Sequence, residues 1–226
     1  MRNKVSAKTK LIIALIALIG IMYVLPIKEI IMDPTIWGAV VARVYITGTL
    51  TDHNCSGSYE KGWNLISIAC IPTNTSVFNM FSSLENNYTS VHGYNTGDAN
   101  DPWKTYNPSM PAWVVQDLEE ISEENGYFIN MNNKSAFYLN GTLLVPNTIT
   151  YGKGWNLIGY PAQNSKGVVE ALSTIQGSYS VIFGYNSINK TYYFYNASFA
   201  DGTLEYVIPG YGYWINMTIE DELFVS

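Results

Sequence analysis

Four glutamates in the middle of the chain are the residues best suited to acid–base chemistry. Glu119 and Glu120 are followed, at a spacing of three to five residues, by Glu123 and Glu124. A pair of carboxyl groups on either side of a glycosidic bond can hydrolyse that bond. The corresponding segment in the second half of the chain lacks the cluster, so a solvated helix face explains it more simply. We therefore predict no catalytic residue here.

A loop over residues 95–101 carries the best candidate metal ligands. Its sequence, Asn-Thr-Gly-Asp-Ala-Asn-Asp, places Asn95, Asp98, Asn100 and Asp101 around a glycine. Calcium prefers such oxygen ligands, but the spacing is not that of an EF-hand, and the matching loop at 186–190 has no acid. Calcium is the one candidate cofactor. The alternative is an ordinary Asp/Asn turn without metal.

The two histidines show no catalytic pattern. His92 aligns with Phe183 in the second half, which indicates a position on a sheet face. His53 lies beside Asp52 and near Cys55, but without the spacing of a zinc site. The chain also has no Gly-x-Ser-x-Gly nucleophile motif. We predict that the protein is not an enzyme.

The two cysteines, Cys55 and Cys70, lie in the first half and have no counterpart in the second. In an exported chain such a pair favours a disulfide over a metal or catalytic site.

Asn-x-Ser/Thr tripeptides are more frequent than composition alone explains. The chain has 22 asparagines and 35 serines and threonines among 226 residues, which gives about three such tripeptides by chance. Eight occur, so we predict several glycosylated, solvent-facing asparagines; an Asn-, Ser- and Thr-rich composition is the simpler alternative. The eight acceptors are Asn54, Asn74, Asn87, Asn133, Asn140, Asn189, Asn196 and Asn216.

The N-terminus has the pattern of an exported or membrane-anchored protein. Residues 1–10 carry four basic residues and no acid, and an apolar run over 11–27 follows, about the minimum length for a spanning helix. No small-residue cleavage site follows soon after. We predict a cytoplasmic segment over 1–10, a single-pass signal-anchor over 11–27 and a connector over 28–43. A cleaved signal peptide and a pilin-like leader are the alternatives.

Charge argues against nucleic acid as a partner. One of the 18 acidic residues and five of the 12 basic residues lie within residues 1–30, so the remainder carries a net charge of −10. Phosphate binding needs clustered lysine and arginine. A net negative charge suits a soluble surface layer.

The elements that position these residues form a tandem repeat. Residues 59–66 match residues 151–158 at seven of eight positions, including Gly-Trp-Asn-Leu-Ile in both copies. The match of 45–50 with 138–143 moves the start of each unit upstream, so we predict modules over 44–136 and 137–226. The last residues of the chain align with the strand that begins the second module.

Within each unit the patterns predict an α+β, β-rich fold of mostly antiparallel sheet with short helices. We expect helices over 77–84 and 168–175 and a second short helix over 115–121. The expected strands are 63–69, 88–94, 103–106 and 126–131 in the first unit, and 155–160, 179–185, 192–195 and 212–217 in the second.

Recurring aromatic residues have two interpretations. Since Trp63/Trp155 and Tyr94/Tyr185 keep their positions in both copies, we expect them to fill the two cores. The aromatic residues that do not recur are the better candidates for a sugar-stacking surface. These are Trp113, Tyr193 and Tyr211.

The Gly-Trp-Asn-Leu-Ile strand, together with Pro-Gly-x-Gly-Tyr-Trp over 209–214, resembles a repeat of secreted archaeal surface proteins, those of methanogens especially, also found in some bacteria. The resemblance covers about residues 44–226 and implies an extracellular module without known catalytic residues. The first unit departs from it, with Glu-Glu-Asn-Gly-Tyr-Phe over 123–128.

The leading hypothesis is a non-enzymatic, membrane-anchored extracellular surface protein, structural or adhesive. Its partners would be the membrane through the N-terminal helix, copies of itself or other surface proteins, and glycans. One alternative is a subunit of an extracellular assembly, such as a filament, a surface layer or the envelope of an archaeal virus. Another is a secreted carbohydrate-active protein.

Overall fold

The computed structural model describes residues 49–226 except 112 and 146. The predicted basic segment 1–10, signal-anchor 11–27 and connector 28–43 lie outside these residues. The described residues belong to one compact unit. Within the described part, no helix is long and apolar enough to span a membrane.

The described chain is β-rich, with few short helices and several antiparallel sheets, as predicted. The first half contains β1 (Thr49–Asn54), β2 (Gly57–Tyr59), β3 (Gly62–Ser67), α2 (Val77–Met80), the 3-10 turn η1 (Ser82–Leu84), β4 (Tyr88–Tyr94), β5 (Trp103–Tyr106), β6 (Gly126–Met131) and β7 (Ser135–Phe137). The second half contains β8 (Asn140–Val145), β9 (Asn147–Tyr151), β10 (Gly154–Ile158), β11 (Lys166–Gly167), α3 (Val168–Ala171), η2 (Ser173–Ile175), β12 (Tyr179–Asn186), β13 (Thr191–Asn196), β14 (Asp201–Gly202), β15 (Tyr206–Val207), β16 (Tyr213–Met217) and β17 (Asp221–Val225).

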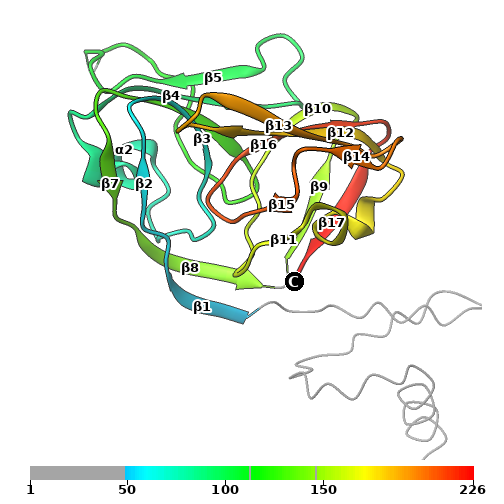
Figure 1. The fold of residues 1–226 in the computed structure, drawn as a ribbon. Helices are drawn as coiled ribbons and strands as arrows, with labels where there is room; N and C mark the ends of the chain where they lie inside the picture. The colour runs from blue at the N-terminus through cyan, green and yellow to red at the C-terminus, as the bar shows by residue number, and fades with distance from the viewer. Residues whose placement is uncertain (1–48, 112, 146) are drawn as a thin grey trace, which may run out of the picture. The chain divides into compact units, whose positions relative to one another are not determined.

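The same arrangement occurs twice. The sheet β3-β6-β4-β5 in the first half corresponds to β10-β16-β12-β13-β14 in the second, and the pair β2–β7 corresponds to β9–β17. We call β2 to β7 module 1 and β9 to β17 module 2. In Figure 1 the two larger sheets lie along the upper side, with the two-stranded pairs below them on opposite sides. Each module encloses its own hydrophobic core.

Residue alternation determines which side of each sheet is buried. In β6, Tyr127, Ile129 and Met131 are buried, and in β16 the equivalent Tyr213, Ile215 and Met217 are buried. Side chains alternate between the two faces of a strand. The intervening residues of both strands therefore point away from the core.

The two predicted first helices are confirmed, each as a short α-helix that continues into a 3-10 turn. The predicted second helix over 115–121 is wrong. Its polar side chains bond the edge strand β5 and the residues after it, since Asp117 accepts from the Thr105 amide at 2.6 Å and Gln116 accepts from the Asn107 amide. Leu118 is buried in the core of module 1. These tertiary contacts replace the local helical hydrogen bonds.

The repeated Gly-Trp-Asn motif forms a tight turn leading into a strand. Gly62 and Gly154 have φ of 85° and 99°, a backbone conformation that glycine adopts readily. The buried Asn64 amide donates to the carbonyls of Glu60 at 2.7 Å and Gly62 at 2.9 Å. Asn156 makes the equivalent bonds in module 2. The asparagine thus satisfies the backbone of the turn.

The two modules meet through matching backbone contacts. Ile66 at the end of β3 pairs with Tyr211, and the equivalent Ile158 of β10 pairs with Asn125. A Cβ on Gly212 would lie 2.6 Å from the Ile66 carbonyl oxygen, and one on Gly126 would lie 2.8 Å from that of Ile158. The glycine that recurs before the tyrosine of β6 and β16 therefore permits close approach of the modules.

We call this contact between the modules the joint. A loop residue from each module adds a hydrogen bond across it. The hydroxyl of Thr96, after β4, donates to the Trp155 carbonyl at 2.8 Å. The ammonium of Lys190, before β13, donates to the Lys61 carbonyl at 3.0 Å. Each module thus holds the start of the other module's Gly-Trp-Asn strand.

The first described strand is tied to the middle of the chain. β1 pairs with β8 along its whole length, and the Cys55 amide donates to the Leu139 carbonyl. Cys55 and Cys70 are joined by a disulfide, with Cα atoms 6.0 Å apart. This crosslink is confined to the first half of the chain.

Candidate functional site

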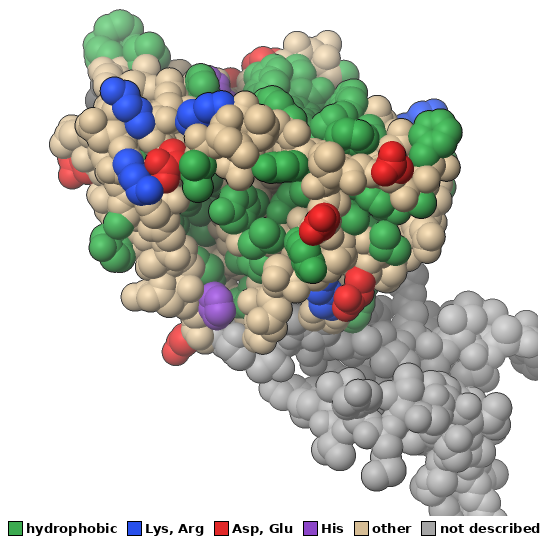
Figure 2. All heavy atoms as spheres, in the orientation of Figure 1, with side chains coloured by type: hydrophobic (Ala, Val, Ile, Leu, Met, Phe, Trp, Pro, Cys, Tyr) green, Lys and Arg blue, Asp and Glu red, His purple; other side chains and the backbone are tan. Residues whose placement is uncertain are grey.

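The outward side of both larger sheets carries a continuous group of aromatic side chains. They alternate with core residues on β3, β4, β6, β10, β12 and β16 and continue onto β5 and β13. Hydrophobic side chains reach the surface above β12 and β13 in Figure 2. We call this group the aromatic face: Trp63, Tyr94, Trp103, Phe128, Trp155, Phe183, Tyr185, Tyr192, Phe194 and Trp214.

Ring contacts make the aromatic face continuous across the joint. The Trp214 ring of module 2 lies 5.0 Å from the Tyr94 ring and 5.8 Å from the Trp103 ring of module 1, centroid to centroid. Within module 2, it lies 6.1 Å from Trp155. Several of these pairs are edge-to-face, an arrangement that the ring quadrupoles favour. Trp214 therefore lies at the centre of the face.

The aromatic face stays in contact with solvent. Trp63, Trp103 and Trp155 are 43 %, 44 % and 41 % exposed. Leaving large apolar side chains in water forgoes their burial free energy. A contiguous exposed patch of this kind marks a binding surface.

Two shallow hollows occupy equivalent places on the aromatic face. The module 1 hollow has a volume of about 450 Å³ and the module 2 hollow about 540 Å³. Each hollow includes side chains of the other module, with Tyr185, Lys190 and Tyr192 in the first and Tyr94 in the second. Trp63, His92, Trp103, Phe128, Tyr185, Lys190 and Tyr192 line the module 1 hollow. Tyr94, Trp155, Phe183, Tyr192 and Trp214 line the module 2 hollow.

Polar groups distinguish the module 1 hollow. The His92 ring nitrogens are hydrogen-bonded to the hydroxyls of Ser90 and Thr105, at 2.9 and 3.0 Å. Burial lowers the pKa of His92, and the Asp117 carboxylate partly opposes that shift. The imidazole is therefore neutral at pH 7 and packs against Trp63, with ring centroids 5.5 Å apart. Among the described residues, Lys190 is the one charged side chain that lines this hollow.

The prediction that Trp63 and Trp155 fill the cores is wrong. The tight turn points each tryptophan outward, while the next residue, asparagine, is the buried one. Alternation within the strand does not reveal this, because Leu65, which lies on the same face of β3 as Trp63, is buried. Tyr94 and Tyr185 are likewise half-buried on the outer side.

The aromatic residues expected to form a binding surface do not gather. Trp113 is 82 % exposed, in the loop between β5 and β6. Tyr193 is half-buried against the core of module 2. Tyr211 lies at the joint, opposite Ile66.

The four glutamates do not line either hollow of the aromatic face. Glu119 and Glu120 are exposed, and Glu120 pairs with Ser76 beside α2. Glu123 and Glu124 lie at the joint, where the Glu124 carbonyl accepts from the Gly159 amide at 2.8 Å. Burial, and secondarily the Glu123 charge, raise the pKa of Glu124.

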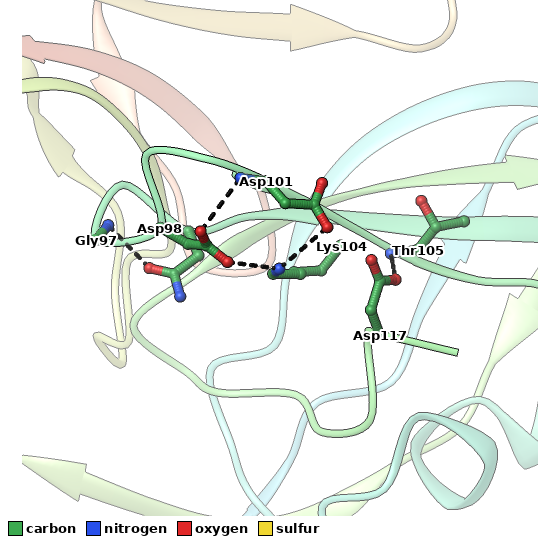
Figure 3. A network of polar contacts seen from close by, with 7 residues as sticks. Gly97, Asp98, Asp101, Lys104, Thr105 and Asp117 are labelled. Atoms are coloured by element: carbon green, nitrogen blue, oxygen red, sulfur yellow. Dashed lines mark hydrogen bonds and ion pairs between the residues drawn. The ribbon is translucent and has the colours of Figure 1, made fainter. Parts of the chain in front are cut away.

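The candidate calcium loop is held by a lysine. The Lys104 ammonium lies 2.8 Å from the Asp98 carboxylate and 3.5 Å from that of Asp101 (Figure 3). The hydrogen bond from Lys104 lowers the pKa of Asp98. Asn95 accepts from the Gly97 amide, as in an ordinary Asx turn. A calcium ion would have to displace Lys104, and the described residues contain no group of three or more His, Cys, Asp or Glu side chains placed to hold a metal. Asn100, the fourth proposed ligand, makes no side-chain hydrogen bond among these residues.

The eight glycosylation candidates differ in what their side chains do. The amides of Asn87, Asn133 and Asn189 donate to neighbouring side chains. The side-chain oxygens of Asn54, Asn74 and Asn196 accept from backbone N–H groups two or three residues further along the chain. Asn140 and Asn216 make no side-chain hydrogen bond among the described residues, and Asn140 is exposed.

His53 lies on β1 opposite Gly141 of β8, and it does not line either hollow.

Comparison with protein-family models, with curated proteins and with solved structures found no match. The resemblance to archaeal surface repeats therefore stays a prediction.

Proposed function

We propose that this chain is a non-enzymatic, membrane-anchored extracellular surface protein that adheres to glycans through its aromatic face. The observation that carries the proposal is the exposed group of tryptophan, tyrosine and phenylalanine rings spanning both modules. Recognition sites combine such apolar area with a small number of placed polar groups.

The side chains of the module 1 hollow suit a sugar ring. A pyranose presents a flat face of C–H groups and an edge of hydroxyls, and aromatic residues with polar tips match both. Trp63 and Trp103 offer ring faces, while Tyr185, Tyr192 and Lys190 offer hydroxyl and ammonium groups. An aliphatic partner would leave these polar groups unpaired, which opposes its binding.

Two features of the sequence support the extracellular location. The basic segment and apolar run over 1–27 match a signal-anchor. The eight Asn-x-Ser/Thr tripeptides suit an exported chain. The two tandem modules would then form the ectodomain, on a cell or on an enveloped particle.

A role in binding rather than catalysis is supported by the chemistry at the aromatic face. No carboxylate of the described residues lines either hollow, and both nitrogens of His92 are hydrogen-bonded to hydroxyls. General acid–base catalysis requires a titratable group within hydrogen-bond reach of the reacting atom. Apart from His92, the titratable side chains among the described lining residues are tyrosines and Lys190, whose ammonium donates to the Lys61 carbonyl.

The test is binding of detergent-solubilised full-length protein to an array of neutral and acidic oligosaccharides. We expect binding that weakens by about tenfold or more in Trp63→Ala, the scale of an interface hot spot. Trp113→Ala is the matched control, because it removes an exposed tryptophan outside the aromatic face.

Absence of binding to every oligosaccharide would contradict the proposal, as would equal binding by both variants. Ordered polymers of the wild type that dissolve in Trp63→Ala would instead identify the face as a contact between copies. Hydrolysis of a bound sugar that disappears in Glu119→Gln or Glu123→Gln would identify an enzyme.

A further inference from the structure

One glycosylation candidate lies on the aromatic face itself. Asn216 belongs to the central strand β16, where it pairs with Trp155 of β10 and Val181 of β12. Directly opposed residues on antiparallel strands share a face, with Cβ atoms about 5 Å apart. Trp214, two residues earlier on the same strand, also points to this face.

We propose that Asn216 carries an N-linked glycan whose first sugars stack on Trp155 and Trp214. The chain's own glycan thereby fills the module 2 hollow. The inference rests on the proposed extracellular function only in that N-glycosylation requires export.

The chemistry around Asn216 suits an attached sugar. Attachment occurs at the side-chain amide nitrogen, and among the described residues the Asn216 amide has no hydrogen-bond partner to release. No fully buried side-chain polar atom among the described residues lacks a partner, and Asn216 is half-buried, so its amide is partly exposed to solvent. The described residues that line the adjacent hollow, about 540 Å³, are all aromatic. Sugars held there would cover exposed apolar surface next to their attachment point.

Module 1 lacks this feature at the equivalent position. Asn130 of β6 pairs with Trp63, as Asn216 pairs with Trp155. The sequence Asn-Met-Asn over 130–132 has no serine or threonine at the third position, whereas 216–218 reads Asn-Met-Thr. The module 1 hollow therefore remains open for an external glycan.

The experiment uses full-length protein purified from cells that glycosylate it. Peptide mass spectrometry measures occupancy at Asn216, and hydroxyl-radical footprinting measures the oxidation rate of Trp155 and Trp63. We expect occupancy at Asn216 and, in Asn216→Gln, oxidation of Trp155 faster by about threefold or more, since its ring regains solvent. Trp63 should be unchanged. Asn140→Gln is the matched control, because it removes an exposed glycosylation candidate on β8, outside the aromatic face.

An unmodified Asn216 would overturn the inference, and so would an occupied Asn216 with Trp155 oxidised equally in both proteins. Either result would leave oligosaccharide binding at Trp63 unaffected, so failure of this inference is distinguishable from failure of the proposed function. An Asn216→Gln protein with the same unfolding midpoint as the deglycosylated wild type shows that the substitution itself preserves the fold. If all tryptophans of Asn216→Gln are oxidised faster to the same extent as Trp155, the glycan does not protect Trp155 locally, and the inference fails.

Discussion

The module 1 hollow and the module 2 hollow occupy equivalent positions but differ in their side chains. Trp63 corresponds to Trp155, whereas His92 corresponds to Phe183 and Phe128 to Trp214. The parts that build the module recur: the Gly-Trp-Asn turn and the glycine at the joint. The scaffold has thus been kept in both copies, while the surface around the tryptophan differs.

Substitution of the equivalent joint glycines, Gly126 and Gly212, should give the largest loss of unfolding free energy. Gly126→Ala and Gly212→Ala each place a Cβ within 2.8 Å of a backbone carbonyl of the other module. We expect each variant to lose about 3 kcal/mol or more of unfolding free energy, at the upper end for overpacking. Urea denaturation measures the loss.

Gly57→Ala is the control, because a Cβ there meets nothing within 4 Å. If the joint variants are as stable as this control, the modules do not meet as described.

The disulfide is a difference between the two halves of the chain. Replacing both Cys55 and Cys70 by serine should lower the unfolding free energy by about 3 kcal/mol, because the crosslink closes a short loop in the unfolded chain. A reducing agent should lower the denaturation midpoint of the wild type and leave that of the double variant unchanged. Two free thiols in the unreduced wild type would contradict the pairing.

A tyrosine hydroxyl fastens a loop in each module. The Tyr127 hydroxyl accepts from the Ser122 amide, and the Tyr213 hydroxyl accepts from the Ile208 amide, both at 2.8 Å. Tyr127→Phe and Tyr213→Phe should each lose about 1 to 2 kcal/mol, since an amide is left without its partner. Thermal denaturation of the two variants compares the modules directly. A loss in only one of them would show that the loops are not equivalent.

The smallest expected effect concerns His92, for which module 2 has phenylalanine. Burial lowers its pKa below the ordinary value of 6.5. The unfolded chain therefore binds a proton more readily than the folded chain. The contribution of His92 to the unfolding free energy is fully present above pH 6.5, and it is lost as pH falls through the folded-state pKa. Denaturation between pH 7 and 5.5 should show a smaller decline for His92→Phe than for the wild type. An equal decline would contradict this role.

Much of the scaffold could be predicted from the sequence, because strand alternation and the repeat are local patterns. The strands over 88–94, 103–106 and 126–131 have the predicted bounds. The helix predicted over 115–121 failed because Gln116 and Asp117 bond the chain at and just beyond β5, a tertiary contact that local spacing does not reveal. The aromatic face was missed because recurrence in both modules was equated with burial. Its extent depends on the joint, which brings Trp214 against Tyr94.

Binding of glycans on the exposed aromatic face should protect its tryptophans from solvent. Hydroxyl-radical footprinting of full-length protein, with and without the oligosaccharide bound on the array, tests it most directly. We expect slower oxidation of Trp63 and Trp103 when the sugar is present, with Trp113 unchanged. Protection of Trp113 in place of Trp63 and Trp103, or no protection of any tryptophan, would contradict it.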